Sequence, residues 1–271
     1  MSAPALLLLC VMGAHASGQS AFDAGVAADR AGDYAAASQH FREALDDGAR
    51  DPAVYHGLGN ALYRQGQVGL AITAWRRGLR LSPLEGDLAA NLDQARGETQ
   101  DRLDPPTPEV GPFFWLRSLS VAHTAAITSA ALTAFLSLIL LRRAHPRDGA
   151  LARLATRLDS PLLLGLSAAL ALLFGASTAL ALREHESAVV TASQVEARSA
   201  LGAEGVGLFA LHEGAEVRVL ESTADAALIA LPDARKGWVS WRALASTDPA
   251  APFPAAPSSA APSPTGAGGS P

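Results

Sequence analysis

Two long uncharged stretches constrain this chain more than any other feature of its sequence. Residues 118–141 and 160–182 contain no Asp, Glu, Lys or Arg. Each stretch exceeds the roughly 20 residues that an α-helix needs to cross the hydrocarbon core of a bilayer. A buried helix of a soluble protein is the alternative, but such a helix rarely stays apolar on every face for so many turns. The sequence therefore predicts two transmembrane helices, at 116–141 and 160–182.

The loop between these stretches, residues 142–159, is rich in arginine. Short loops that carry an excess of Lys and Arg stay on the cytoplasmic side of a membrane. The loop is therefore predicted to be cytoplasmic, and both flanking parts of the chain are predicted to lie outside the cytoplasm. The arginines that set this topology are Arg142, Arg143, Arg147, Arg153 and Arg157.

The N-terminus carries a second, independent signal for export. An apolar centre from Ala3 to Met12 is followed by Ala14, His15 and Ala16, a small-x-small cleavage pattern. Residues 1–16 are therefore predicted to be a secretory signal peptide, although no Lys or Arg precedes the apolar centre. Cys10 is the only cysteine, so cleavage would leave a mature chain without disulfides, thiolate catalysis or cysteine zinc sites.

A repeat with a period of 34 residues lies before the first predicted span. When the chain is shifted by this period, Gly25 aligns with Gly59, Ala37 with Ala71, and Phe41 with Trp75. The spacing of glycine, alanine and aromatic residues resembles that of the tetratricopeptide repeat. The resemblance implies a domain of paired helices at 20–98. We expect the glycines to allow close approach of helices and the aromatic rings to fill the space between successive pairs.

Polar residues in the second repeat form a candidate partner-binding face. They are spaced i, i+4, i+7 and i+8, so they share one side of the predicted helix. In the tetratricopeptide family this side is concave and commonly holds a peptide, while ordinary solvent exposure is the alternative for each single residue. The candidates are His56, Asn60, Tyr63 and Arg64, with Asn91 from the following helix.

Short β-favouring runs follow the second predicted span. Their alternation and turn residues predict a small all-β barrel at 187–245, and the runs from Leu211 to Leu244 resemble the bacterial SH3 domain. Trp238 and Trp241 are the candidate ligand-binding residues; we expect Trp238 to place its ring in the barrel core and Trp241 to be the more exposed. The proline-rich stretches 99–112 and 246–271 are predicted to be an extended linker and a disordered tail.

The composition and motifs indicate binding without catalysis. The net charge of −5 and the absence of a basic stripe argue against nucleic acid as a partner. The sequence contains no metalloprotease, serine hydrolase or nucleotide-binding motif, and we expect no enzyme activity, cofactor or metal.

The order of parts narrows the functional expectation. The chain resembles the BatE proteins of bacterial aerotolerance (Bat) operons in the order of its parts: a signal peptide, tetratricopeptide helices, two membrane helices and an SH3-like barrel. This resemblance implies a multidomain inner-membrane scaffold with both soluble domains in the periplasm, acting with other Bat-type membrane proteins in envelope stress tolerance or assembly. The alternative is a cell-wall sensor or anchor whose barrel binds peptidoglycan.

Overall fold

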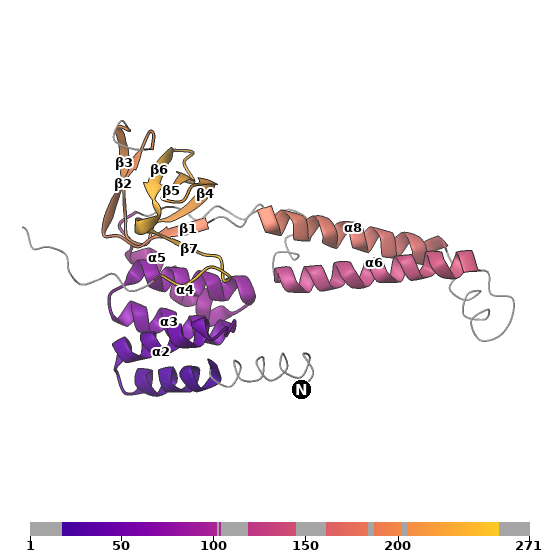
Figure 1. The fold of residues 1–271 in the computed structure, drawn as a ribbon, viewed down its shortest axis with the longest axis horizontal. Helices are drawn as coiled ribbons and strands as arrows, with labels where there is room; N and C mark the ends of the chain where they lie inside the picture. The colour runs from indigo at the N-terminus through magenta and orange to yellow at the C-terminus, as the bar shows by residue number, and fades with distance from the viewer. Residues whose placement is uncertain are drawn as a thin grey trace, which may run out of the picture.

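The computed structural model describes residues 18–101, 103, 119–144, 161–183, 187–201 and 205–254. Figure 1 shows a stack of helices, a small sheet beside it, and two long helices that extend away from both. The predicted signal peptide and Arg147, Arg153 and Arg157 of the predicted loop lie outside the described residues. The fold thus combines helical pairs, an antiparallel sheet and a helical hairpin.

Helices fill residues 18–98 and are joined by short turns. Gly32, Gly48 and Gly66 take positive φ angles in three of these turns, a conformation that a side chain disfavours. Asp33 and Asp51 accept hydrogen bonds from backbone N–H groups at the starts of the helices that follow them. Helical residues 18–30 are followed by α2 (Tyr34–Asp46), α3 (Pro52–Arg64), α4 (Val68–Leu81) and α5 (Gly86–Glu98).

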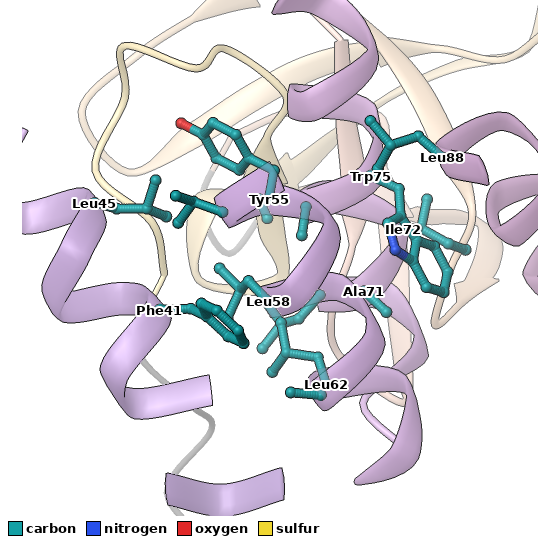
Figure 2. Close-up of a cluster of buried hydrophobic side chains, with 14 of the residues drawn as sticks. Phe41, Leu45, Tyr55, Leu58, Leu62, Ala71, Ile72, Trp75 and Leu88 are labelled. Carbon is teal, nitrogen blue, oxygen red and sulfur yellow. The ribbon is translucent and has the colours of Figure 1, made fainter. Parts of the chain in front are cut away.

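Aromatic rings and glycines set the spacing of these helices. A methyl group built on Gly25 or on Gly57 would overlap the ring of Phe41, and one on Gly59 would overlap the indole of Trp75. Both rings are buried, and Figure 2 shows them among the aliphatic side chains of α2, α3 and α4. Ala37 and Ala71 are fully buried in the same core. These seven residues therefore pack the helices together.

The strands form one seven-stranded antiparallel sheet in the order β3-β2-β6-β5-β4-β1-β7. Gly214, between β3 and β4, has a φ of 88°, and Ala234, between β5 and β6, has a φ of 68°. The strands are β1 (Ser187–Val190), β2 (Gln194–Arg198), β3 (Gly207–His212), β4 (Glu216–Ser222), β5 (Ala226–Ala230), β6 (Lys236–Ser240) and β7 (Leu244–Ser246), with a 3-10 turn, η2 (Trp241–Ala243), before β7.

The sheet and the helices share a hydrophobic core, which the sequence did not indicate. Val189 of β1 and Ala245 of β7 are buried in the cluster that fills the helical stack, because α4 packs against these two strands. At Gly69 of α4 a side chain would overlap the carbonyl oxygen of Val190. The helices and the sheet therefore form one soluble body, here defined as residues 18–103 and 187–254 where described.

The described residues of two predicted connecting segments, 99–101, 103 and 246–254, are part of this body. Residues 99–112 were expected to be a linker, but Thr99 is buried and Asp101 pairs with His212 of β3 at 3.0 Å. The prediction of disorder from residue 246 onward is wrong for residues 246–254, which lie on the helices. Carbonyl groups and one phenylalanine ring of this segment contact the helical stack. The predicted domain ends at residues 98 and 245 therefore exclude residues that belong to the body.

The helices α6 (Val121–Ala144) and α8 (Pro161–Arg183) are long and apolar enough to cross a membrane. They pack against each other, with Phe174 buried at their contact and Gly175 facing the methyl group of Thr128. Arg142 and Arg143 lie in the last turn of α6. The small residues Ala126, Ala130 and Ala134 of α6 are exposed.

Candidate functional site

Three of the five predicted groove residues meet on one face of the helical stack. His56 and Asn60 lie one turn apart on α3, and Asn91 reaches them from α5. The Nδ2 atom of Asn91 lies 2.9 Å from Oδ1 of Asn60 and 3.2 Å from Nε2 of His56. All three side chains are half-buried. The face between α3 and α5 therefore carries a connected polar cluster.

Trp75 fixes the orientation of this cluster. The indole N–H can only donate, and it donates to Oδ1 of Asn60 at 3.2 Å. The Nδ2 group of Asn60 must then face Nε2 of His56, which accepts at 3.3 Å and so carries its proton on Nδ1. Among the described residues this Nδ1–H has no hydrogen-bond partner. It is therefore available to a carbonyl group of a bound chain.

The other two predicted groove residues form separate contacts on the same face. The Tyr63 hydroxyl donates to the carboxylate of Glu98, with O–O distances of 2.6 and 2.7 Å, and accepts from Gln94. The hydrogen bond to Glu98 raises the pKa of Tyr63. Arg64 donates to the Tyr34 hydroxyl at 2.9 Å and lies over its ring. The face therefore presents a guanidinium at the C-terminal end of α3 and a carboxylate at the C-terminal end of α5.

Glu98 also borders a cavity that the sequence did not predict. The cavity has a volume of about 220 Å³ and lies where the ends of α4 and α5 meet the sheet. Its lining includes Glu98, Gln100, His212 and Glu213. The carboxylate of Glu213 accepts a hydrogen bond from the backbone N–H of Gly69 at 2.8 Å, so it stabilises the N-terminus of α4 from the sheet.

A second contact between helices and sheet centres on Glu216 of β4. Its carboxylate binds the guanidinium groups of both Arg76 on α4 and Arg96 on α5. Burial lowers the pKa of Arg96, but the Glu216 and Asp93 carboxylates outweigh burial and raise it. No local pattern in the sequence pairs residues that lie 140 and 120 positions apart.

The two candidate tryptophans of the sheet do not lie as expected. Gly237 and Val239 of β6 are buried, and strand alternation therefore places the half-buried Trp238 on the outer face, across from Leu228 of β5. Trp241 packs partly against the sheet core, and its indole N–H donates to Ser222 at 3.2 Å. The expected place of Trp238 in the core is therefore not seen, and Trp241 is partly buried as well, because it follows β6 in η2, where strand alternation no longer applies.

The described residues bring together hydrogen-bonding groups and no set of groups suited to metal ligation. Within the described ranges, no three His, Cys, Asp or Glu side chains are placed to hold a metal ion. Comparisons with protein-family models, curated proteins and solved structures give no match. The geometry of the polar face is therefore the basis for a functional assignment.

Proposed function

We propose that this chain is a membrane-anchored, non-catalytic scaffold that binds an extended segment of a protein partner on the face between α3 and α5. The observation that carries the proposal is the oriented cluster of His56, Asn60 and Asn91. A preset Nδ1–H donor beside amide groups suits the repeating carbonyl and N–H groups of a peptide backbone. Glu98 and Arg64, at the margins of the cluster, offer contacts to charged side chains of the partner.

The continuity of the soluble body supports one compartment for both soluble parts. Val189 and Ala245 are buried among helical side chains, and a bilayer cannot separate groups that share a core. If α6 and α8 both cross the membrane, the helices before them and the sheet after them must lie on the same side. The arginine-rich loop and the export signal then support the periplasmic side of a bacterial inner membrane.

The architecture supports a scaffold of the Bat type. Helical pairs packed through glycine and aromatic residues agree with tetratricopeptide repeats, and a small antiparallel sheet after two apolar helices agrees with an SH3-like domain. The partners in that case are other Bat-type membrane proteins, and the scaffold assists envelope stress tolerance or assembly.

Co-purification of the full membrane-extracted chain tests the binding face. The variant Arg64→Glu combined with Asn91→Leu removes a marginal charge and a central amide, and we expect loss of most co-purifying partner. The matched control is Glu43→Lys, a charge reversal on the exposed side of α2. Equal recovery of partner with both variants would refute the proposed face. A reporter that is active only in the cytosol, fused after residue 271, is expected to stay inactive.

A second candidate function is cell-wall binding by the sheet. The outward position of Trp238 favours it, because an indole on an open sheet face can stack on a sugar or peptide. Sedimentation of the extracted protein with purified sacculi tests this function. Binding that Trp238→Ala reduces at least tenfold, while Trp241→Phe leaves it unchanged, would favour an anchor over a protein scaffold.

A further inference from the structure

The segment that follows β7 lies across the helical stack on a part separate from the polar face. We define the strap as residues 247–254, which lie beside α4 in Figure 1 and contact residues of α2, α3 and α4. Thr247 contacts Arg80 of α4 at 3.1 Å, and the Tyr55 hydroxyl of α3 donates to the carbonyl oxygen of Pro249 at 3.1 Å. Figure 2 shows this hydroxyl pointing toward the strap. The strap therefore lies on the helices in the way that a bound peptide would.

Arg77 of α4 is built to hold an extended backbone. The side chain is 1% exposed, and its guanidinium donates to three carbonyl oxygens, those of Ser246, Ala251 and Pro252, at 2.7 to 3.2 Å. Burying a guanidinium without acceptors costs several kcal/mol, so the position requires a carbonyl-rich chain beside it. Because backbone carbonyls satisfy it, Arg77 does not depend on the side chains of its ligand.

Phe253 supplies the side-chain specificity of this contact. Its ring packs against the helical core, with the guanidinium carbons of Arg77 at 5.0 Å and of Arg42 at 5.8 Å from the ring centre. Cation–π attraction at such distances favours an aromatic ring at this position. Pro252 and Pro254 flank the ring, and proline favours an extended backbone while donating no hydrogen bond. The site therefore selects an aromatic residue between prolines.

Arg42 shows that the strap does not use the whole site. Among the described residues its Nε and Nη2 atoms are buried without a hydrogen-bond partner. Burial lowers the pKa of Arg42, and Asp46 acts against this effect. A ligand with an acceptor next to its aromatic residue would satisfy Arg42 and bind more tightly than the strap does.

We propose that α2, α3 and α4 form a second peptide site, specific for an extended segment with a proline-flanked aromatic residue, and that the strap is its resident ligand. Only a few residues separate Phe253 from β7, so the strap is present at an effective concentration on the order of millimolar. A segment from a partner protein must therefore displace the strap in order to bind. The strap thus restricts the site to partners that are abundant, locally concentrated or better matched to Arg42.

A peptide of residues 246–256, labelled with a fluorophore, tests the site by anisotropy. We expect saturable binding to a chain that ends after Thr247, and at least tenfold weaker binding to the full chain, whose own strap occupies the site. A Phe253→Ala peptide should bind the truncated chain at least tenfold more weakly. No binding to a truncated chain that retains its cooperative unfolding transition, or equal binding to both chains, would overturn the proposal.

Two further measurements keep the test decisive if the truncated chain does not fold. The full chain with Phe253→Ala retains the strap backbone but loses the ring, and it should bind the wild-type peptide at least threefold more tightly than the unaltered full chain. The absence of any gain would overturn the proposal. An Ala255→Glu peptide, which keeps both flanking prolines and adds a carboxylate two positions after Phe253, should bind more tightly than the wild-type peptide, and equal affinity would refute the role assigned to Arg42.

Discussion

The soluble body and the α6–α8 hairpin are packed by different rules. In the soluble body, rings of Phe41 and Trp75 lie against glycines and leave no room for a methyl group. In the hairpin, a methyl group built on Gly175 would lie at an ordinary contact distance of 3.6 Å from the Thr128 methyl group, and one on Gly165 would meet no atom within 4 Å. Only 11% of the most apolar part of each long helix is buried.

This difference shows in which of the two regions the sequence specifies the packing face of a helix. In water, apolar residues mark the face of a helix that packs, and aromatic or glycine residues then fix the distance. Along α6 and α8 every face is apolar, so hydrophobicity does not single out the packing face. The soluble body is therefore expected to respond strongly to small changes at its contacts, and the hairpin weakly.

The largest expected effect comes from Arg77→Met. The change leaves the three carbonyl groups that Arg77 holds without their donor, and we expect a loss of about 3 kcal/mol in the free energy of unfolding of the soluble body. Urea unfolding followed by tryptophan fluorescence measures it. Arg242→Met, at an exposed position, is the control. A loss below 1 kcal/mol would contradict the anchoring role of Arg77.

A matched pair of glycine substitutions compares the two regions directly. Gly59→Ala would push against Trp75, whose indole is held by Asn60 and cannot retreat, and overpacking of this kind costs about 1–3 kcal/mol. Gly175→Ala should leave the hairpin unchanged, because the added methyl group meets Thr128 at an ordinary distance. Thermal unfolding in detergent reports both. Equal effects would remove the contrast between the regions.

Glu216→Gln tests the polar contact between helices and sheet. The change removes the charge shared by Arg76 and Arg96, and we expect a loss of about 1–2 kcal/mol. The difference from wild type should shrink as salt is added, since ions screen partly exposed pairs. A Glu221→Gln variant, on an exposed position of β4, controls for the loss of one negative charge. A salt-independent difference would point to packing instead.

The smallest expected effect is a pH dependence from Tyr55. Burial raises the pKa of Tyr55, although Arg77 and Arg50 act in the opposite direction. The neutral hydroxyl is thus favoured in the folded state, so its contribution is complete below the unfolded value of about 10 and is lost as pH rises through the higher folded value. Tyr55→Phe should flatten the fall in stability above pH 10. An unchanged slope would contradict the shift.

Local patterns in the sequence predicted the elements of the fold better than their assembly. The period that aligns Gly25 with Gly59 and Phe41 with Trp75 predicted the residues that pack the helices, because each contact spans at most two neighbouring helices. The contact of the helices with the sheet joins segments more than a hundred residues apart. It relies on single residues such as Gly69 and Glu216, which no periodicity marks.

The candidate site shows the same limit. Helical spacing predicted that His56 and Asn60 share a face, and the phase of the next helix predicted that Asn91 joins them. The role of Trp75 in orienting Asn60 could not be predicted, since the indole was assigned to packing alone. The strap residues were predicted to be disordered because a proline-rich composition shows only how little apolar surface a segment can bury by itself. The composition does not show that the buried Arg77 donates hydrogen bonds to the carbonyl groups of this segment.

The Glu213 carboxylate at the start of α4 has a consequence for biosynthesis. A ribosome completes α4 long before it reaches the sheet, and the acceptor for the Gly69 N–H comes 144 residues later. During that interval the nascent helices expose the surface that β1 and β7 later cover, while both apolar helices are made. A chaperone that shields this surface until synthesis ends would raise the yield of folded protein.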